Sequence, residues 1–131
     1  MDSIKYELGS NKVVTLLMDA PGKVNIMDQA FQDSLKSVTA QLLEEPDLKG
    51  IIFASAKNTF FAGGDLKRLS TVEKDQGGQF FENLESMKAC FRKIEKLGLP
   101  VVAAINGTAL GGGWEICLSC HHRICIDSPK I

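Results

Sequence analysis

The chain lacks any long apolar run, because its longest uninterrupted apolar segments span about five residues. A membrane-spanning helix needs about 20 consecutive apolar residues, so the sequence predicts no transmembrane segment. Residues 1–5 also lack the apolar stretch of a secretory signal peptide, and we therefore expect a cytoplasmic location. The net charge of −1 gives no indication of a nucleic-acid partner.

Cysteine and histidine are scarce, but most of them are clustered near the end of the chain. Cys117, Cys120 and Cys125, with His121 and His122, superficially resemble the Cys₃His ligand set of a zinc site. No second Cys-x-x-Cys pair is present, and Cys117 and Cys120 can serve as small apolar residues of a helix. We therefore expect free thiols and no metal, with the two histidines ending the helix, where a cation is favoured.

The sequence does contain alternating strand and helix patterns. Strands are expected over residues 4–8, 13–19, 50–55 and 101–105, and from about residue 123. Helices are expected over residues 28–44, 79–97 and about 111–120. Residues 70–78 are polar and predict a flexible surface loop, with Gly77 and Gly78 as helix breakers. This alternation in 131 residues predicts one α/β domain, residues 1–131, with a largely parallel sheet.

Two of the expected helices carry an apolar stripe at a spacing of 3.6 residues. The stripe of the first consists of Phe31, Leu35, Val38 and Leu42. The stripe of the second consists of Phe80, Leu84, Met87, Phe91 and Ile94. Such stripes are typical of helices that pack on a core, and we favour that role over cofactor binding.

Two glycine-rich segments follow expected strands and open helices. Gly63 and Gly64 precede Asp65, which is expected to cap a short helix by accepting the N–H of Lys67 or Arg68. Residues 111–113 are three glycines, and a helix that begins there leaves several N–H donors unpaired at its positive end. Glu115 follows directly and has apolar neighbours, which suits a group that exchanges protons. The pattern predicts a backbone that stabilises an anion beside an acid or base.

These segments resemble a known family. Residues 61–67, Phe-Ala-Gly-Gly-Asp-Leu-Lys, resemble the first signature of the crotonase (enoyl-CoA hydratase/isomerase) superfamily, and residues 100–115 resemble the second. The resemblance extends from about residue 13 to the end of the chain and implies the crotonase-like ββα spiral. Residues 120–130 are most similar to the hydratase domain of multifunctional fatty-acid β-oxidation α subunits, which also carry a 3-hydroxyacyl-CoA dehydrogenase.

The resemblance implies roles for individual residues. The N–H groups of Gly64 and Gly112 would form an oxyanion hole for the acyl-CoA thioester, and Glu115 would be the first of two catalytic glutamates. The implied acyl-CoA contacts are Lys23, Val24, Ala62, Gly63, Gly64, Asp65, Leu66, Lys67 and Gly112. The chain departs from the family at position 64, which is often Ala, and at Trp114, a bulkier residue expected either to narrow the acyl pocket or simply to pack.

The family's second catalytic glutamate lies in a stretch that the 131 residues do not contain. We therefore expect the chain to be the N-terminal portion of a hydratase domain and to be inactive alone. The implied reaction is hydration of trans-2-enoyl-CoA, which needs no cofactor, whereas NAD would serve a downstream dehydrogenase domain. The implied partners are further copies of the chain or a thiolase β subunit. Alternatives are an isomerase, a thioester hydrolase or a decarboxylase of the same fold, or a non-catalytic assembly module.

Overall fold

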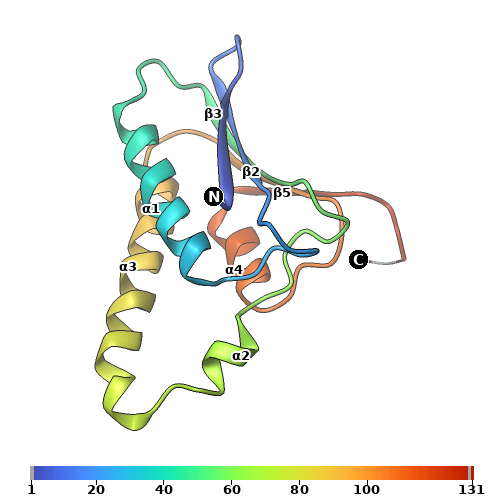
Figure 1. The fold of residues 1–131 in the computed structure, drawn as a ribbon. Coiled ribbons are helices and arrows are strands. Elements are labelled where there is room, and N and C mark those ends of the chain that lie inside the picture. The colour runs from blue at the N-terminus through green and yellow to red at the C-terminus, as the bar shows by residue number, and fades with distance from the viewer. Residues whose placement is uncertain (1, 130) are drawn as a thin grey trace.

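A computed structural model describes residues 2–129 and 131 (Figure 1). The strands are β1 (Ile4–Leu8), β2 (Val13–Met18), β3 (Gly50–Ser55), β4 (Val101–Ile105) and β5 (His122–Cys125). The helices are α1 (Gln29–Glu44), α2 (Leu66–Leu69), α3 (Gly77–Glu95) and α4 (Gly112–Ser119), with a 3-10 turn, η1 (Lys74–Gln76). The expected order of elements is therefore confirmed over most of the chain.

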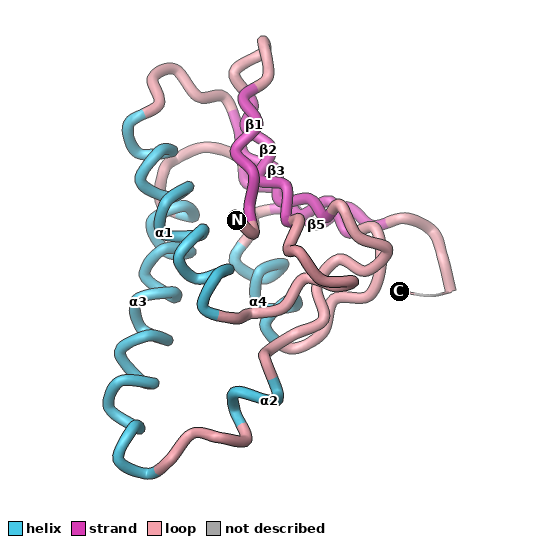
Figure 2. The backbone as a smooth tube through the Cα atoms, in the orientation of Figure 1, coloured by secondary structure: helices cyan, strands magenta, loops and turns pink. Residues whose placement is uncertain are grey.

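The strands form one sheet in the order β1-β2-β3-β4-β5, which is also their order in the sequence. β1 pairs antiparallel with β2, whereas the pairs β2–β3, β3–β4 and β4–β5 are parallel. Because crossovers between parallel strands are right-handed, a sheet that grows in one direction places its helices on one face. Figure 2 shows α1, α3 and α4 on the same side of the strands. The mixed sheet confirms the α/β class and the ββα beginning of the expected spiral.

The core lies between this face of the sheet and the helices. Buried residues alternate along β2, where Val14, Leu16 and Met18 face inward. β4 alternates in the same way. The whole predicted stripe of α1 is buried, namely Phe31, Leu35, Val38 and Leu42. In α3, Met87 and Ile94 are buried, whereas Phe80 and Leu84 are only partly covered.

The segment expected to be a surface loop, residues 70–78, is partly helical. Residues 74–76 form η1, and the capping box of Glu73 and Gln76 begins a helical turn there. Gly77 and Gly78 continue this turn as the first residues of α3, so the prediction that they break the helix is wrong. The helical propensity of a glycine is a weak preference, and a preceding cap can override it.

The end of α4 also differs from expectation. The helix ends at Ser119, so His121 and His122 do not end it, and His122 is the first residue of β5. The cation at this helix end is Arg123, whose Nη1 donates to the carbonyl oxygens of Cys117 and Cys120 at 3.1 and 3.0 Å. The Nδ1 atom of His121 instead accepts the N–H of Val101 at 3.1 Å. Across the described residues, no helix combines the length and the apolar character that crossing a membrane requires.

Candidate active site

The loops that follow β3 and β4 run side by side at the carboxyl ends of these strands. The N–H groups of Phe60 and Phe61 donate to the carbonyl oxygen of Thr108 at 3.0 and 3.1 Å. The N–H of Leu110 donates back to the carbonyl oxygen of Phe61 at 3.0 Å. These bonds fix the two glycine-rich segments next to each other, at the edge where open parallel sheets bind ligands.

Glycine is required where the loops touch. Gly63 has a φ of 102°, and a Cβ there would lie 3.2 Å from the carbonyl oxygen of Leu110. Gly111 has a φ of 47°, and a Cβ there would lie 3.9 Å from the Cα of Gly63. A side chain at Gly63 would both strain the backbone and separate the loops.

Met27 lies against both loops and connects them. Its N–H donates to the carbonyl oxygen of Gly63 at 2.9 Å, and it forms a parallel bridge with Gly64. A Cβ on Gly112 would lie 2.8 and 2.9 Å from the Cε and Sδ atoms of Met27. Within residues 2–129 and 131, neither Gly64 nor Gly112 donates its N–H to an acceptor. Two unpaired backbone donors therefore lie on either side of one methionine.

Gly64, Gly112 and Glu115 all line one cavity of about 180 Å³. Its apolar lining consists of Met27, Leu69, Phe80, Leu84 and Met87. Its other polar residues are Gln32, Asp65, Arg68 and Asn83. An apolar cavity with a few convergent polar groups is the usual form of a small-molecule site.

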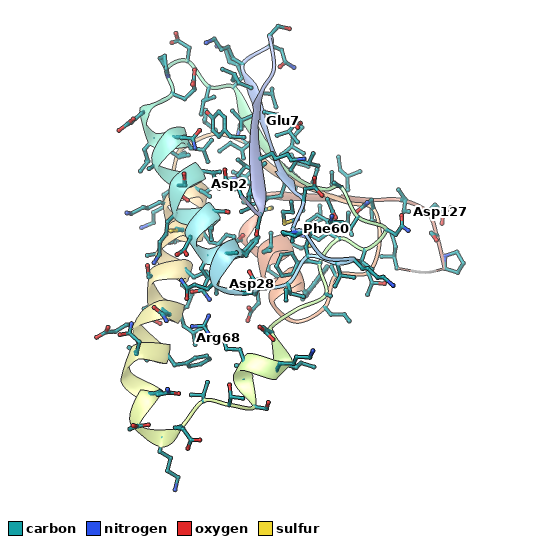
Figure 3. The ribbon with its side chains drawn as sticks, in the orientation of Figure 1. Asp2, Glu7, Asp28, Phe60, Arg68 and Asp127 are labelled. Atoms are coloured by element: carbon teal, nitrogen blue, oxygen red, sulfur yellow. The ribbon has the colours of Figure 1, made fainter. Side chains whose placement is uncertain are left out.

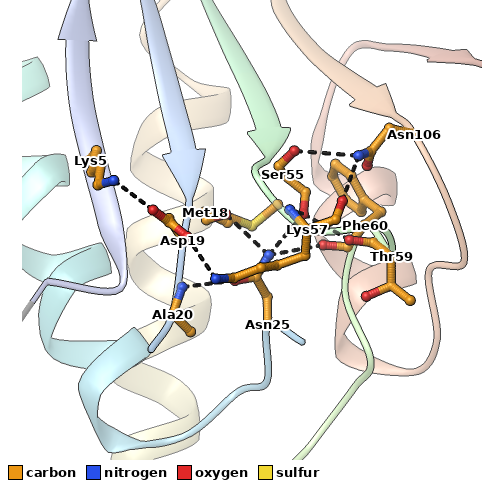
Figure 4. A network of polar contacts seen from close by, with 10 residues as sticks. All are labelled: Lys5, Met18, Asp19, Ala20, Asn25, Ser55, Lys57, Thr59, Phe60 and Asn106. Carbon is orange, nitrogen blue, oxygen red and sulfur yellow. Dashed lines mark hydrogen bonds and ion pairs between the residues drawn. The ribbon is translucent and has the colours of Figure 1, made fainter. Parts of the chain in front are cut away.

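The loop after β3 is held by the side chain of Asn25, which is almost completely buried (Figure 4). Its Nδ2 donates to the carbonyl oxygen of Met18, to the Oγ of Ser55 and to the carbonyl oxygen of Phe60, at 3.2, 2.9 and 3.3 Å. Its Oδ1 accepts the N–H of Ala20 at 3.0 Å. One side chain thus fixes the carboxyl ends of β2 and β3 relative to the loop that leads to Gly64.

Asp65 caps α2, as the sequence predicted. Its Oδ1 accepts the N–H groups of Lys67 and Arg68 at 3.1 and 3.2 Å. These two bonds set the direction in which the chain leaves Gly64. They also occupy one carboxylate oxygen of a residue that lines the cavity.

The other residues expected to contact acyl-CoA lie away from the cavity lining. Lys23, Leu66 and Lys67 are exposed, and Val24 is half-buried. Ala62 and Gly63 belong to the supporting backbone, where the N–H of Ala62 donates to the carbonyl oxygen of Asn25 at 2.8 Å. Four of the predicted site residues are therefore brought together: Gly64, Asp65, Gly112 and Glu115.

Glu115 lies in the first turn of α4 and is exposed. The expected apolar surroundings are only partly present, because Trp114 and Leu118 point to solvent with 47% and 59% of their surface exposed. Trp114 does not line the cavity. Among the three apolar neighbours predicted for Glu115, only Ile116 is buried. The prediction failed here because successive residues of a helix project in different directions.

The thiols of Cys117, in α4, and of Cys120, directly after it, are buried. Burial raises the pKa of Cys117 to about 11 and that of Cys120 to about 12. Cys125, in β5, is exposed. Among the described residues, no three His, Cys, Asp or Glu side chains are grouped so that they could hold a metal ion.

Several cavity residues were not predicted as site residues. Met27, Gln32 and Arg68 come from three separate segments, and no local pattern distinguishes them. Phe80 and Leu84 belong to the stripe of α3 that was assigned to the core, but the half-exposed start of this stripe lines the cavity. The polar residues Gln79 and Asn83 beside this stripe were the sequence signal that the start of α3 is not fully buried in the core.

Comparisons with known proteins agree with this geometry. Residues 9–131 match the sequence profile of the family described as enoyl-CoA hydratase/isomerase. An enoyl-CoA hydratase from Bacillus anthracis is similar, with 30% identity and a TM-score of 0.83 over 97% of this chain and 48% of that chain. An enoyl-CoA hydratase from Bacillus halodurans shares 26% identity, with a TM-score of 0.82 over 95% of this chain and 50% of that chain.

A structure from Magnetospirillum magneticum, described as an enoyl-CoA hydratase/carnithine racemase, has a TM-score of 0.81 over 95% of this chain and 46% of that chain. Its identity of 22% shows a shared fold only. The chain spans about half the length of these solved structures. Because the family profile covers nearly all of the sequence, the chain belongs to the enoyl-CoA hydratase/isomerase family.

Proposed function

We propose that the protein containing this chain hydrates trans-2-enoyl-CoA to 3-hydroxyacyl-CoA. The N–H groups of Gly64 and Gly112 hold the thioester oxygen as negative charge develops on it. Glu115 exchanges a proton with the substrate or with the attacking water. The observation that carries the proposal is that these three residues line one cavity, with no acceptor for the two N–H groups among the described residues.

The chemistry follows from the positions of these groups. Polarising the thioester carbonyl draws electrons away from the double bond, so water adds at C3 and an enolate forms. Fixed backbone donors stabilise that enolate without reorganising during the reaction. Addition of water and protonation of C2 are best served by two carboxyls, and Glu115 supplies one of them in this proposal. The hydration step needs no cofactor.

Replacing Glu115 by Gln tests the proposal in the full-length protein with crotonyl-CoA. The amide keeps the shape but cannot exchange a proton, so kcat should fall by about 10²–10⁴-fold. Glu44→Gln, at the exposed end of α1 and outside the cavity, is the matched control. Near-normal turnover by the Glu115 variant would remove this residue from the mechanism.

Isomerisation of 3-enoyl-CoA is the alternative reaction, because moving a double bond requires only one proton-shuttling carboxyl. Glu115 supports it, since the other lining carboxylate, Asp65, is engaged in capping α2. The two reactions are separated by incubating the protein with 3-enoyl-CoA and identifying the first product. Formation of a 2-enoyl thioester from 3-enoyl-CoA indicates isomerisation. A protein that leaves 3-enoyl-CoA unchanged but converts 2-enoyl-CoA to the 3-hydroxyacyl thioester is a hydratase.

We also propose that the protein containing this chain acts in fatty-acid β-oxidation as part of a larger multifunctional enzyme. The resemblance of residues 120–130 to multifunctional α subunits supports a cytoplasmic role in fatty-acid β-oxidation, with an NAD-dependent 3-hydroxyacyl-CoA dehydrogenase in the same protein. It further supports assembly with a thiolase β subunit or with further copies of the chain. Reduction of NAD by the full-length protein with 3-hydroxybutyryl-CoA tests the dehydrogenase. Absence of reduction would restrict the protein to the hydratase or isomerase step.

A further inference from the structure

The side chain of Gln32 has a polar atom with no partner in the candidate active site. Gln32 belongs to α1, is 8% exposed and lines the cavity. Its Oε1 is buried and accepts no hydrogen bond from any described residue. Buried amide oxygens in folded proteins nearly always have a partner, because burial removes their hydrogen bonds to water. This atom is therefore a candidate contact for a bound molecule.

Hydrogen-bond donors lie on the opposite elements of the same cavity. Arg68, after Asp65 in α2, uses one Nη1 bond of 3.2 Å to the Oε1 of Gln29. Its guanidinium carries five N–H groups, so most of them are not used by this bond. Figure 3 shows Arg68 in the space between the start of α1 and α3. Asn83, in α3, accepts the Nε2 of Gln79 with its Oδ1, which leaves its own amide protons for other partners.

The charges of the cavity limit what these groups can bind. Two carboxylates, Asp65 and Glu115, line it together with one cation, Arg68. A bound anion would face both carboxylates and the oxygen of Gln32, and a plain alkyl chain would leave that oxygen without a partner. A hydroxyl group satisfies the set, because it donates one hydrogen bond and accepts another.

We propose that the cavity selects acyl chains that carry a hydroxyl group, which donates to Gln32 Oε1 and accepts from Arg68 or Asn83. This inference rests on the proposed acyl-CoA function and adds a substrate class to it. The apolar walls formed by Phe80, Leu84 and Met87 contact the methylene groups between the thioester and the hydroxyl. A cavity of about 180 Å³ has room for several chain atoms, since one water needs only about 10–15 Å³ of such volume.

The test compares three thioesters that share the six-carbon 2-hexenoyl chain, with the full-length protein: 2-hexenoyl-CoA, its 6-hydroxy derivative and its 6-carboxy derivative, 2-heptenedioyl-CoA. The measured quantity is kcat/KM for each. The hydroxylated substrate should be preferred over the alkyl one by at least about tenfold, because sites built to hydrogen-bond a hydroxyl discriminate against chains that lack it. Gln32→Leu should lower or reverse this ratio, whereas Gln41→Leu, at an exposed position of α1, should preserve it.

Gln32→Met is a second variant of nearly the same shape and should change the ratio in the same direction as Gln32→Leu. Equal kcat/KM for the alkyl and hydroxylated chains, or a ratio that both Gln32 variants leave unchanged, overturns the inference but not the proposed function. Preference for the carboxylate overturns it as well and assigns Arg68 as the anchor. Turnover of none of the thioesters rejects the proposed function and the inference together.

Discussion

A Cβ on Gly113 would lie 2.6 Å from the Cβ of Phe61 and 2.8 Å from its carbonyl oxygen. α4 therefore packs on the loop after β3 at a position where only a hydrogen atom fits. Gly113→Ala should destabilise the protein by about 2–3 kcal/mol, because backbone atoms must move to admit the methyl group. Urea denaturation of wild type and variant measures the difference. Substitutions at unconstrained surface positions usually change the free energy of unfolding by less than about 0.5 kcal/mol. A loss of stability that small would contradict this packing.

Gly78→Ala should have the opposite effect. Gly78 lies in the first turn of α3, and a Cβ there would meet no atom within 4 Å. Alanine should stabilise the protein by about 0.5–1 kcal/mol, because it has fewer unfolded conformations and a higher helical propensity. The same denaturation measurement checks it, and an unchanged or lower midpoint would indicate that this turn is not helical in solution.

Asn25→Ala should strongly destabilise the protein, although it removes only a small polar side chain. The substitution leaves the Ala20 N–H and the carbonyl oxygens of Met18 and Phe60 without their side-chain partner. Buried groups left unpaired in this way typically cost about 2 kcal/mol or more in total. Asn25→Asp should also destabilise, because a carboxylate cannot donate to carbonyl oxygens. The control is Asn58→Ala at an exposed position, and equal midpoints for Asn25→Ala and this control would refute the bracing role.

Asp19 makes the stability depend on pH in the acid range. Hydrogen bonds from the ammonium groups of Lys5 and Lys57, at 2.5 and 2.7 Å, lower its pKa from 3.8 to about 2. Because the pKa is lower in the folded state, the stabilisation is complete above about pH 4 and is lost as the pH falls towards 2. The Tm difference between wild type and Asp19→Asn should therefore shrink across this interval. Asp2→Asn serves as the exposed control, and a difference that stays constant down to pH 2 would contradict the ion pairs.

Thiol reactivity should separate the cysteines into two classes. Cys125 is exposed, whereas Cys90, Cys117 and Cys120 are buried. Burial also raises the pKa of Cys117 and Cys120, and only the thiolate reacts. Titration with DTNB at pH 8 should show one fast thiol per chain, which Cys125→Ser removes. Two or more fast thiols in the folded protein would mean that α3, which carries Cys90, or the end of α4 is not packed as described.

Most of the fold was predictable because its signals are local. The stripe of Phe31, Leu35, Val38 and Leu42 repeats every 3.6 residues, and all four residues are buried as expected. Asp65 caps α2 through the N–H groups that its position in the sequence indicated. Gly77 and Gly78 were misjudged because single-residue propensity ignores the capping box that precedes them.

The candidate site was predictable only in part. Gly64, Gly112 and Glu115 belong to short motifs, so their residue types were visible in the sequence. The same cavity is also lined by Gln32 from α1, Arg68 from α2 and Asn83 from α3, which meet only through helix packing. No periodicity or motif relates three such residues. The exposure of Trp114 likewise depends on how α4 is rotated against the sheet.

The Asn25 side chain also has a consequence for motion. It connects the end of β2, the end of β3 and the approach to the glycine turn, so none of these segments can detach without breaking bonds in the others. Such coupling makes a cooperative unit whose amide protons exchange together. The Ala20 and Ala62 amides should exchange with deuterium as slowly as the sheet interior, which would keep the backbone that leads to Gly64 rigid.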